Sequence, residues 1–392
     1  MLPLEGVRVV ALEQAVAAPF TTRQLADLGA TVIKIERPGS GDFARHYDKT
    51  VQGLSSHFVW LNRSKKSVTL NVKHQQADAI IGRLLARADV FVQNLAPGAA
   101  ARLGLSGAAL VARFPRLIVC NISGYGDRGP YRDKKAYDLL VQSEAGLVSI
   151  TGSPEAPAKV GISVADIAAG MYAYSGVLTA LYQRRDSGFG TVLDVSMFDA
   201  LGEWMGYPAY YTAYGGSAPQ RTGTRHATIA PYGQFTSRDG QAVLLGIQNE
   251  REWAQFCDEV LRRPELTHDS RFVSNDDRAA HYAELETEIN KVFSELTADE
   301  IVARLDNAQI ANAHVNNMQE FWEHPQLDAR DRRLNIETPV GPITALLPPV
   351  IMAGAEVRMG PVPALGEHTD EVLRDLGYTA GQIADLGSAG AI

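Results

Sequence analysis

The chain has 392 residues, of which 45% are hydrophobic and 21% charged, and its formal net charge is −8. This length allows two domains, or one large domain with an insertion, and the composition is typical of a globular protein. Binding to nucleic-acid phosphates requires a basic surface, so nucleic acid is not expected as the main partner.

The termini and cysteines give no sign of export or of a metal site. Cys120 and Cys257 are too few for a disulfide framework, and no C-x-x-C or H-E-x-x-H spacing is present. The opening MLPLEGVRVVALEQ lacks the basic and apolar regions of a signal peptide. No apolar run approaches the roughly 18 residues of a membrane span. We therefore expect a cytoplasmic protein without a membrane partner.

Strand-like and helix-like segments alternate through the first half of the chain. Strands are predicted at 7–12, 31–36, 67–73, 89–94 and 117–122, and helices at 18–29 and 75–88. The alternation indicates βαβ units and a parallel sheet, hence an α/β fold. Ligands on such sheets bind at the carboxyl ends of the strands, which fall near Glu13, Glu36, Asn94 and Ser123.

The second half begins with a long helical pattern at 163–185 and a strand at 191–197. A linker-like stretch rich in Gly, Pro, Tyr and Thr follows, up to about residue 230. Beyond it we expect a hairpin turning at Asp239-Gly240 and charged helices near 249–262, 279–295 and 298–306. Thr297 and Glu300 form a capping-box pattern for the last helix. Residues 333–358 look strand-like, and a helix at 369–376 precedes a Gly/Ala tail.

These patterns predict four consecutive regions. Residues 1–200 form the first part of a large domain, 201–230 a linker and 231–325 a small α+β domain, and 326–392 return to the large domain.

Gly124-x-Gly126-x-x-Gly129 has the spelling of a dinucleotide-binding fingerprint. That fingerprint normally occupies the first βα turn, but the corresponding stretch here, ALEQAVAAPF, has no glycine. Pro130 follows the third glycine, and a helical pattern starts only near Tyr137. We therefore expect a glycine-rich turn and no NAD.

Cations and hydrogen-bonding side chains gather at four predicted strand ends. They could form a cradle for a phosphorylated, adenine-containing ligand, or they could simply be solvated. The sequence leaves both readings open for Arg37, Arg63, Lys65, Lys66, Lys73, Asn94, Arg102, Lys134, Lys135 and Tyr137.

Asp166 lies near the start of the long helix and has two readings. With Ser163 it fits the capping box S-x-x-[DE], which would make it structural. Alternatively it is a carboxylate nucleophile, with space for a bulky thioester left by its small neighbours Ala165, Ala168, Ala169 and Gly170. Arg221, Arg225 and His226 stand in a polar loop and could contact an acidic substrate or lie on the surface.

Taken together, several blocks resemble family III CoA-transferases, the group that includes formyl-CoA transferase and carnitine CoA-transferase. They are PLEGVRVV at the start, LGATVIKIERPGSGD at 28–42, LNVK at 70–73, QNLAPGAAARLG at 93–104, SGYGDRGPYRDKKAYD at 123–138, VADIAAGMYAYSGVLTALYQR at 164–184, GTVLDVSMFDA at 190–200 and LGEHTDEVL at 365–373. The resemblance implies a Rossmann-like large domain plus a smaller α+β domain, with two chains interlocked as a homodimer.

The resemblance also implies a site in which Asp166 is the catalytic residue and coenzyme A is bound, with no metal. The implied CoA contacts are Arg37, Leu70, Asn71, Val72, Lys73, Asn94, Arg102, Lys135, Tyr137 and Asp138. Two features depart from related patterns. The run of four glycines in formyl-CoA transferase has no counterpart between 225 and 260, and Tyr137 stands where α-methylacyl-CoA racemases use a histidine.

In the implied reaction Asp166 attacks an acyl-CoA, forming an anhydride and then an aspartyl-CoA thioester that an acceptor carboxylate opens. Residues 197–216 and 221–233 resemble the subgroup that handles C4–C6 dicarboxylic acids, so Arg221, Arg225 or His226 would neutralise a second carboxylate. Three alternatives stay open: intramolecular CoA transfer within mesaconyl-CoA, an α-methylacyl-CoA racemase-like reaction, and a CoA- or nucleotide-binding module without catalysis.

Overall fold

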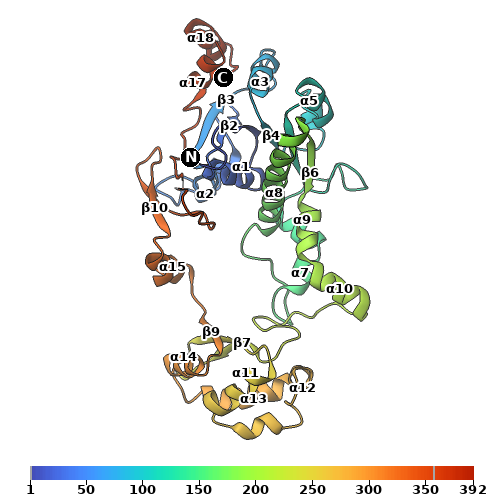
Figure 1. The fold of residues 1–392 in the computed structure, drawn as a ribbon, viewed down its shortest axis with the longest axis vertical. Helices are drawn as coiled ribbons and strands as arrows, with labels where there is room; N and C mark the ends of the chain where they lie inside the picture. Colours follow the sequence, from blue (N-terminus) through green and yellow to red (C-terminus); the bar gives the residue numbers. More distant parts are fainter. Residues whose placement is uncertain (1, 356–357) are drawn as a thin grey trace. The chain divides into compact units, whose positions relative to one another are not determined.

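The computed structural model describes residues 2–355 and 358–392, which form two compact units (Figure 1). The first unit comprises Met1–Gly146, Val160–Gly206 and Leu327–Ile392, and the second comprises Leu147–Lys159 and Tyr207–Gln326. The second unit thus includes a short segment, 147–159, that lies within the predicted large domain in sequence.

A six-stranded sheet with the order β3-β2-β1-β4-β5-β6 forms the centre of the first unit. Every neighbouring pair is parallel, which confirms the α/β prediction. This strand order is that of a doubly wound Rossmann-like sheet, whose switch point lies between β1 and β4. The strands are β1 (Arg8–Leu12), β2 (Thr31–Glu36), β3 (Lys65–Thr69), β4 (Val90–Gln93), β5 (Ile118–Ser123) and β6 (Val192–Ser196).

Strand β3 is displaced from its predicted range of 67–73. It begins at Lys65 and ends at Thr69. The side chain of Asn71 accepts a hydrogen bond from the Lys73 backbone N–H at 3.2 Å, and this Asx turn takes the chain out of the sheet.

One face of the sheet is covered by helices α3 (Ala77–Leu85), α5 (Gly107–Arg113), α17 (Thr369–Asp375) and α18 (Ala380–Ser388), which share an apolar core with Val10 and Leu12. The predicted Gly/Ala tail is therefore wrong, because a capping box formed by Thr379 and Gln382 starts α18. Alternate residues of a strand point to opposite faces, so Lys34 of β2 faces away from this core, in which Ile33 and Ile35 lie.

The opposite face carries α1 (Ala17–Asp27), α2 (Ser56–Asn62) and the long helix α8 (Val164–Ser187). Helices α1 and α8 pack along each other, and α8 also contacts β5 and β6. By length and composition α8 could cross a membrane, a test that the core helix of a globular protein also passes. Within residues 2–355 and 358–392 it is the one helix that meets this test.

The remaining elements of the first unit are short. They are η1 (Phe43–His46), α4 (Ala99–Arg102), α6 (Asp138–Glu144), α9 (Met197–Trp204), α16 (Pro325–Ala329, at the boundary) and the hairpin of β10 (Arg333–Ile336) and β11 (Ile343–Leu346).

An antiparallel sheet with the order β7-β8-β9 and a separate apolar core form the second unit. The predicted hairpin at Asp239-Gly240 joins β7 to β8, and the predicted capping box of Thr297 and Glu300 starts α14. Residues 201–230 are not a plain linker, because they contain the end of α9 and all of α10 (Gly206–Gly215). The other elements are α7 (Leu147–Ile150), β7 (Tyr232–Thr236), β8 (Ala242–Gly246), α11 (Glu250–Gln255), η2 (Phe256–Val260), η3 (Pro264–His268), α12 (Asn275–Ala280), α13 (Tyr282–Phe293), α14 (Ala298–Asn307), β9 (Ala311–His314) and α15 (Met318–Trp322).

Candidate active site

Asp166 lies in the first turn of α8, but it does not take part in a capping box. Ser163, the N-cap residue, makes no side-chain hydrogen bond to the helix. The cap comes instead from Asp138, whose Oδ1 accepts hydrogen bonds from the backbone N–H groups of Ala165 at 2.8 Å and Asp166 at 3.3 Å. The capping-box reading of Asp166 is therefore wrong, and its carboxylate is available for another role.

The amino-terminal turn of α1 lies against Asp166. The Ala17 N–H belongs to the first turn of α1, where it has no partner within its own helix, and it lies near enough to the Asp166 carboxylate to lower the pKa of that group. Gly170, one turn further along α8, makes this approach possible, because a Cβ there would lie 2.9 Å from the Ala17 carbonyl oxygen. The Thr21 hydroxyl donates to the Gly170 carbonyl at 3.0 Å and fixes the two helices in register.

The protonation of Asp166 is set by its surroundings. Burial raises the pKa of Asp166 to about 7, the Asp138 charge contributes in the same direction, and the backbone N–H of Ala17 opposes both. A carboxylate held at neutral pH in a poorly hydrated position is more reactive than one in water. Such a perturbed carboxyl group is a candidate nucleophile.

Replacing Asp138 by asparagine is expected to move the acidic limb of kcat/KM to lower pH. The asparagine Oδ1 can still accept the two backbone N–H bonds, but the charge that raises the pKa of Asp166 is gone. Since Asp166 must be ionised to attack, wild-type activity should fall as the pH drops through about 7, and the variant should fall at a lower pH. Initial rates between about pH 5 and about pH 9 measure this, and an unshifted limb would contradict it.

The loop that leads into α1 is held from two sides. Asn94 accepts a hydrogen bond from the Gln14 N–H at 2.9 Å and donates one to the Gln14 carbonyl at 2.8 Å. Asp42 accepts from the Ala15 N–H at 3.1 Å, and Ala15 has a left-handed φ of 63°. The predicted ligand residue Asn94 thus positions a loop beside the site.

A buried cluster of four charges lies behind this loop: Glu13, Lys34, Asp42 and Lys65. The Lys34 Nζ lies 2.8 Å from Asp42 Oδ2 and 3.4 Å from Glu13 Oε1, and the Lys65 Nζ lies 2.7 Å from Glu13 Oε1. Burial lowers the pKa of Lys65 to about 8, whereas in Lys34 the carboxylates outweigh burial and the pKa is raised. Two acids and two bases make the cluster neutral, so Lys65 is not a free cation for a ligand.

Arg63, Lys66 and Lys134 likewise have partners of their own. Arg63 donates from Nη2 to Asp27 at 2.7 Å, Lys66 from Nζ to Glu371 at 2.6 Å, and Lys134 pairs with Glu144. Fewer cations are therefore available to bind a ligand than the sequence suggested.

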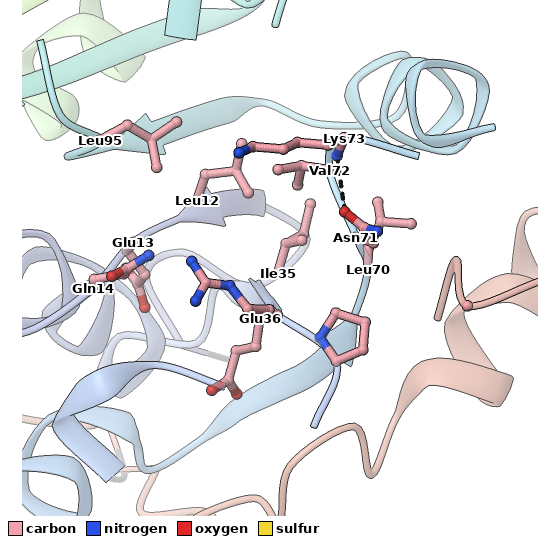
Figure 2. A pocket seen from close by; sticks show the side chains of 13 residues that line it. Leu12, Glu13, Gln14, Ile35, Glu36, Leu70, Asn71, Val72, Lys73 and Leu95 are labelled. Atoms are coloured by element: carbon pink, nitrogen blue, oxygen red, sulfur yellow. Dashed lines mark hydrogen bonds between the residues drawn. The ribbon is translucent and has the colours of Figure 1, made fainter. Parts of the chain in front are cut away.

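A cavity of about 500 Å³ opens at the carboxyl ends of the strands, next to the loop that carries Gln14 (Figure 2). It brings together five of the predicted ligand residues: Arg37, Leu70, Asn71, Val72 and Lys73. The other lining residues are Leu12, Glu13, Gln14, Ile35, Glu36, Pro38, Leu95 and Gly390.

The cavity combines apolar walls with exposed cations. The carboxylate of Glu36 is already paired, with its Oε1 2.7 Å from Arg45 Nη2, and hydrogen bonds from Arg45 help to lower the pKa of Glu36 to about 2 against the opposing effect of burial. Glu13 is neutralised by the buried lysines. Arg37 and Lys73 are exposed, so the cavity suits a ligand with both apolar and anionic parts.

The other predicted CoA residues do not line the cavity. Arg102 is exposed at the end of α4, and Lys135 is exposed in the glycine-rich loop. Tyr137, the N-cap residue of α6, is 67% exposed. Gly126 and Gly129 have φ values of 87° and 80° and α6 begins only at Asp138, as expected for a turn and not for a dinucleotide fingerprint.

Each of the three predicted substrate residues has a local partner in the second unit. The Arg221 guanidinium donates to the backbone carbonyls of Ser149, Ser153 and Pro154 at 3.0–3.1 Å. Arg225 lies 4.2 Å from the centroid of the Tyr282 ring, and His226 stacks on Tyr232 with ring centroids 5.5 Å apart.

Gln14, Tyr47 and Gly390 are among the residues beside the site that were not predicted. Burial raises the pKa of Tyr47 to about 12, and the nearby charges of Asp42 and Asp166 contribute. Gln14 lies two residues beyond the end of β1, so its place at a strand end is a signal that could have identified it. Tyr47 and Gly390 reach the site through long-range packing, for which the sequence has no local pattern.

The site thus presents a half-buried carboxylate with a raised pKa and, at the strand ends, a cavity for a partly apolar anion. This combination is typical of acyl transfer through a covalent intermediate on a carboxylate. Within residues 2–355 and 358–392, no group of three or more His, Cys, Asp or Glu side chains is arranged to hold a metal ion.

Comparison with known proteins gives the family. Residues 4–369 match the model of CoA-transferase family III. The chain is 33% identical to the succinyl-CoA:glutarate CoA-transferase of Homo sapiens, over 100% of this chain and 90% of that protein. It is 33% identical to the succinyl-CoA--D-citramalate CoA-transferase of Chloroflexus aurantiacus, over 98% of this chain and 96% of that protein. The crystal structure of a CAIB/BAIF family protein from Brucella suis has a TM-score of 0.84 and 30% identity, and the match covers 96% of this chain and 99% of that one. The chain belongs to CoA-transferase family III, and it is an enzyme that transfers CoA.

Proposed function

We propose that this enzyme moves CoA from succinyl-CoA or a similar thioester to a C4–C6 dicarboxylic acid such as mesaconate, itaconate, citramalate or glutarate. The observation that carries the proposal is Asp166, a carboxylate with a pKa of about 7 against the amino-terminal turn of α1. Two relatives named for succinyl-CoA and a dicarboxylic acceptor, glutarate or citramalate, support the substrate class.

The mechanism begins with attack of the Asp166 carboxylate on the thioester carbonyl, which breaks the C–S bond and gives a mixed anhydride and CoA thiolate. The thiolate then attacks the aspartyl carbonyl, releasing the donor acid and forming an aspartyl-CoA thioester. The acceptor carboxylate displaces CoA from this thioester and forms a second anhydride. The CoA thiolate then attacks the carbonyl carbon that the acceptor acid contributes to this second anhydride, which gives the new acyl-CoA and restores the Asp166 carboxylate.

CoA must remain bound while the two acids exchange, so the cavity would hold it throughout. Arg37 and Lys73, with the turn at 70–72, would meet its phosphate-bearing part. We assign Arg102, Lys135, Tyr137 and Asp138 to the same ligand, as the family resemblance implies. A second carboxylate of the substrate would meet Arg221, Arg225 or His226.

The proposal includes an interlocked homodimer in the cytoplasm. Apolar side chains of α8 that face outwards in the single chain support a partner: Tyr182 is 69% exposed, and Met171 and Tyr172 are more than a third exposed. Cys120 and Cys257 are free and buried, which fits a reducing compartment.

A screen of several acyl-CoA donors against a panel of dicarboxylates, read by chromatography of the CoA esters, tests the proposal. We expect a new acyl-CoA with at least one dicarboxylate and none with the Asp166→Ala variant. Formation of an isomeric thioester from mesaconyl-CoA without an added acceptor would indicate intramolecular transfer. Racemisation of a 2-methylacyl-CoA, with no transfer to any acid, would overturn the proposal.

A further inference from the structure

The carboxyl-terminal end of α18 forms a turn of its own, which we call the α18 turn (Ala389–Ala391). Gly390 has a left-handed φ of 70°, its N–H donates to the Gly387 carbonyl at 3.0 Å, and the Ala391 N–H donates to the Leu386 carbonyl at 2.9 Å. These two bonds are those of a Schellman motif, which reverses the chain direction at a helix end.

This reversal brings the α18 turn against the CoA cavity. The Ala391 carbonyl, on a fully buried residue, accepts a hydrogen bond from the Asn71 N–H at 2.7 Å. Gly390 itself lines the cavity. Figure 2 shows Asn71 and Lys73 in the same lining. An element more than 300 residues away in sequence thus contacts the wall that carries the exposed lysine.

The Asn71 turn needs an outside partner because it has left the sheet. The Leu70 N–H still donates to the Glu36 carbonyl at 2.8 Å, but β3 ends at Thr69 and Asn71 comes after this last ladder bond. Within the turn, Asn71 accepts from the Lys73 N–H through its side chain and from the His74 N–H through its carbonyl. The Ala391 carbonyl is therefore the contact that ties the Asn71 backbone to the rest of the unit.

We propose that the α18 turn is a positioning element for CoA: by holding Asn71, it fixes the direction in which Lys73 is presented to the ligand. The inference rests on the proposed function, in which the cavity binds CoA. Loss of the turn should weaken CoA binding and leave the chemistry at Asp166 intact, because Asp166 lies on a separate element, α8.

Substitution of Gly390 tests the turn through its backbone. A Cβ at Gly390 would have no atom of the chain within 4 Å, so a side chain there strains the left-handed φ without clashing with the protein. Valine is strongly disfavoured in that conformation, whereas asparagine adopts it readily. Gly387→Ala is the matched control, since its Cβ also meets nothing within 4 Å and Gly387 lies within the helix itself.

We expect Gly390→Val to raise the Kd of CoA about tenfold, which corresponds to about 1.4 kcal/mol. Its kcat at saturating acyl-CoA should stay within about twofold of wild type. Gly390→Asn places a side chain at the same point but tolerates the left-handed φ, so it should weaken CoA binding less than Gly390→Val does, and Gly387→Ala should bind CoA like wild type. Titration calorimetry with CoA measures Kd, and hydrogen exchange of the peptide covering 70–74 should be faster in Gly390→Val. Should the valine variant not fold, Gly390→Ala makes the same test with a smaller effect.

A Gly390→Val enzyme that melts at a lower temperature but binds CoA as tightly as wild type, with unchanged exchange at 70–74, overturns this inference alone. A wild-type enzyme that does not bind CoA overturns the proposed function, and the inference with it.

Discussion

Asp166→Asn is expected to reduce the rate of CoA transfer by at least roughly 10⁴-fold. At about pH 8 and above, the same substitution is expected to raise the melting temperature of the protein. The loss of activity follows because an amide cannot attack the thioester. The gain in stability follows from the raised pKa of the native carboxyl group. Activity and stability are thus expected to change in opposite directions, as is common when a strained group is kept for function.

The pH dependence of this gain follows from the two pKa values of Asp166, about 3.9 in the unfolded chain and about 7 in the native state. Below about pH 4 both states hold the proton and the group contributes nothing. Between these values the unfolded chain releases the proton first, so wild type loses stability as the pH rises, and above about pH 7 the cost is constant at a few kcal/mol.

Melting curves at about pH 5 and about pH 8 for wild type, Asp166→Asn and Asp166→Ala measure the effect. Asp186→Asn, an exposed site in the last turns of the same helix, is the control and should change neither activity nor stability. Asp166→Asn that is less stable than wild type at pH 8 would contradict the raised pKa, and near-normal turnover would contradict the nucleophile role.

Lys34→Met is expected to cost about 3–5 kcal/mol of unfolding free energy, because it leaves the buried carboxylate of Asp42 without its ammonium partner. In the double variant Lys34→Met with Asp42→Asn the cost should be clearly smaller. The asparagine carries no charge, and its Oδ1 can still accept the N–H bonds of Ala15 and Ala44.

Urea unfolding of wild type, Lys34→Met, Asp42→Asn and the double variant gives the coupling between the two sites. Lys66→Met is the matched control: it changes a lysine of the neighbouring strand β3, whose ammonium pairs with Glu371 at the surface, and should cost less than about 1 kcal/mol. A double variant as unstable as Lys34→Met would mean that the charge imbalance is not the cause.

The parallel sheet could be predicted from the sequence because its strands are short apolar runs separated by amphipathic helices. Asp166 could be singled out for a similar reason, since it is a carboxylate among small residues at a helix start. Its role could not be decided there. Asp138, which lies 28 residues earlier in the chain, caps α8 in its place by accepting the first backbone N–H groups of the helix. A partner so distant in sequence cannot be recognised from a local pattern.

The predictions that were wrong failed because contacts in the folded chain override what the local sequence suggests. Lys65 looked like a loop cation, but it lies in β3 and its charge is cancelled by Glu13 across the sheet. The strand predicted at 67–73 ends early because the Asn71 side chain competes for the backbone. The Gly/Ala tail is α18, and its Gly390 lines the cavity through a contact that only the folded chain creates.

The central claim is that Asp166 carries the covalent intermediate, and trapping it is the most direct test. Wild type is incubated with succinyl-CoA in the absence of an acceptor, quenched in acid, digested and analysed by mass spectrometry. The account predicts an acyl or CoA adduct on the peptide that contains Asp166, and no adduct on that peptide in Asp166→Ala. An adduct on another residue, or full turnover by Asp166→Ala, would contradict it.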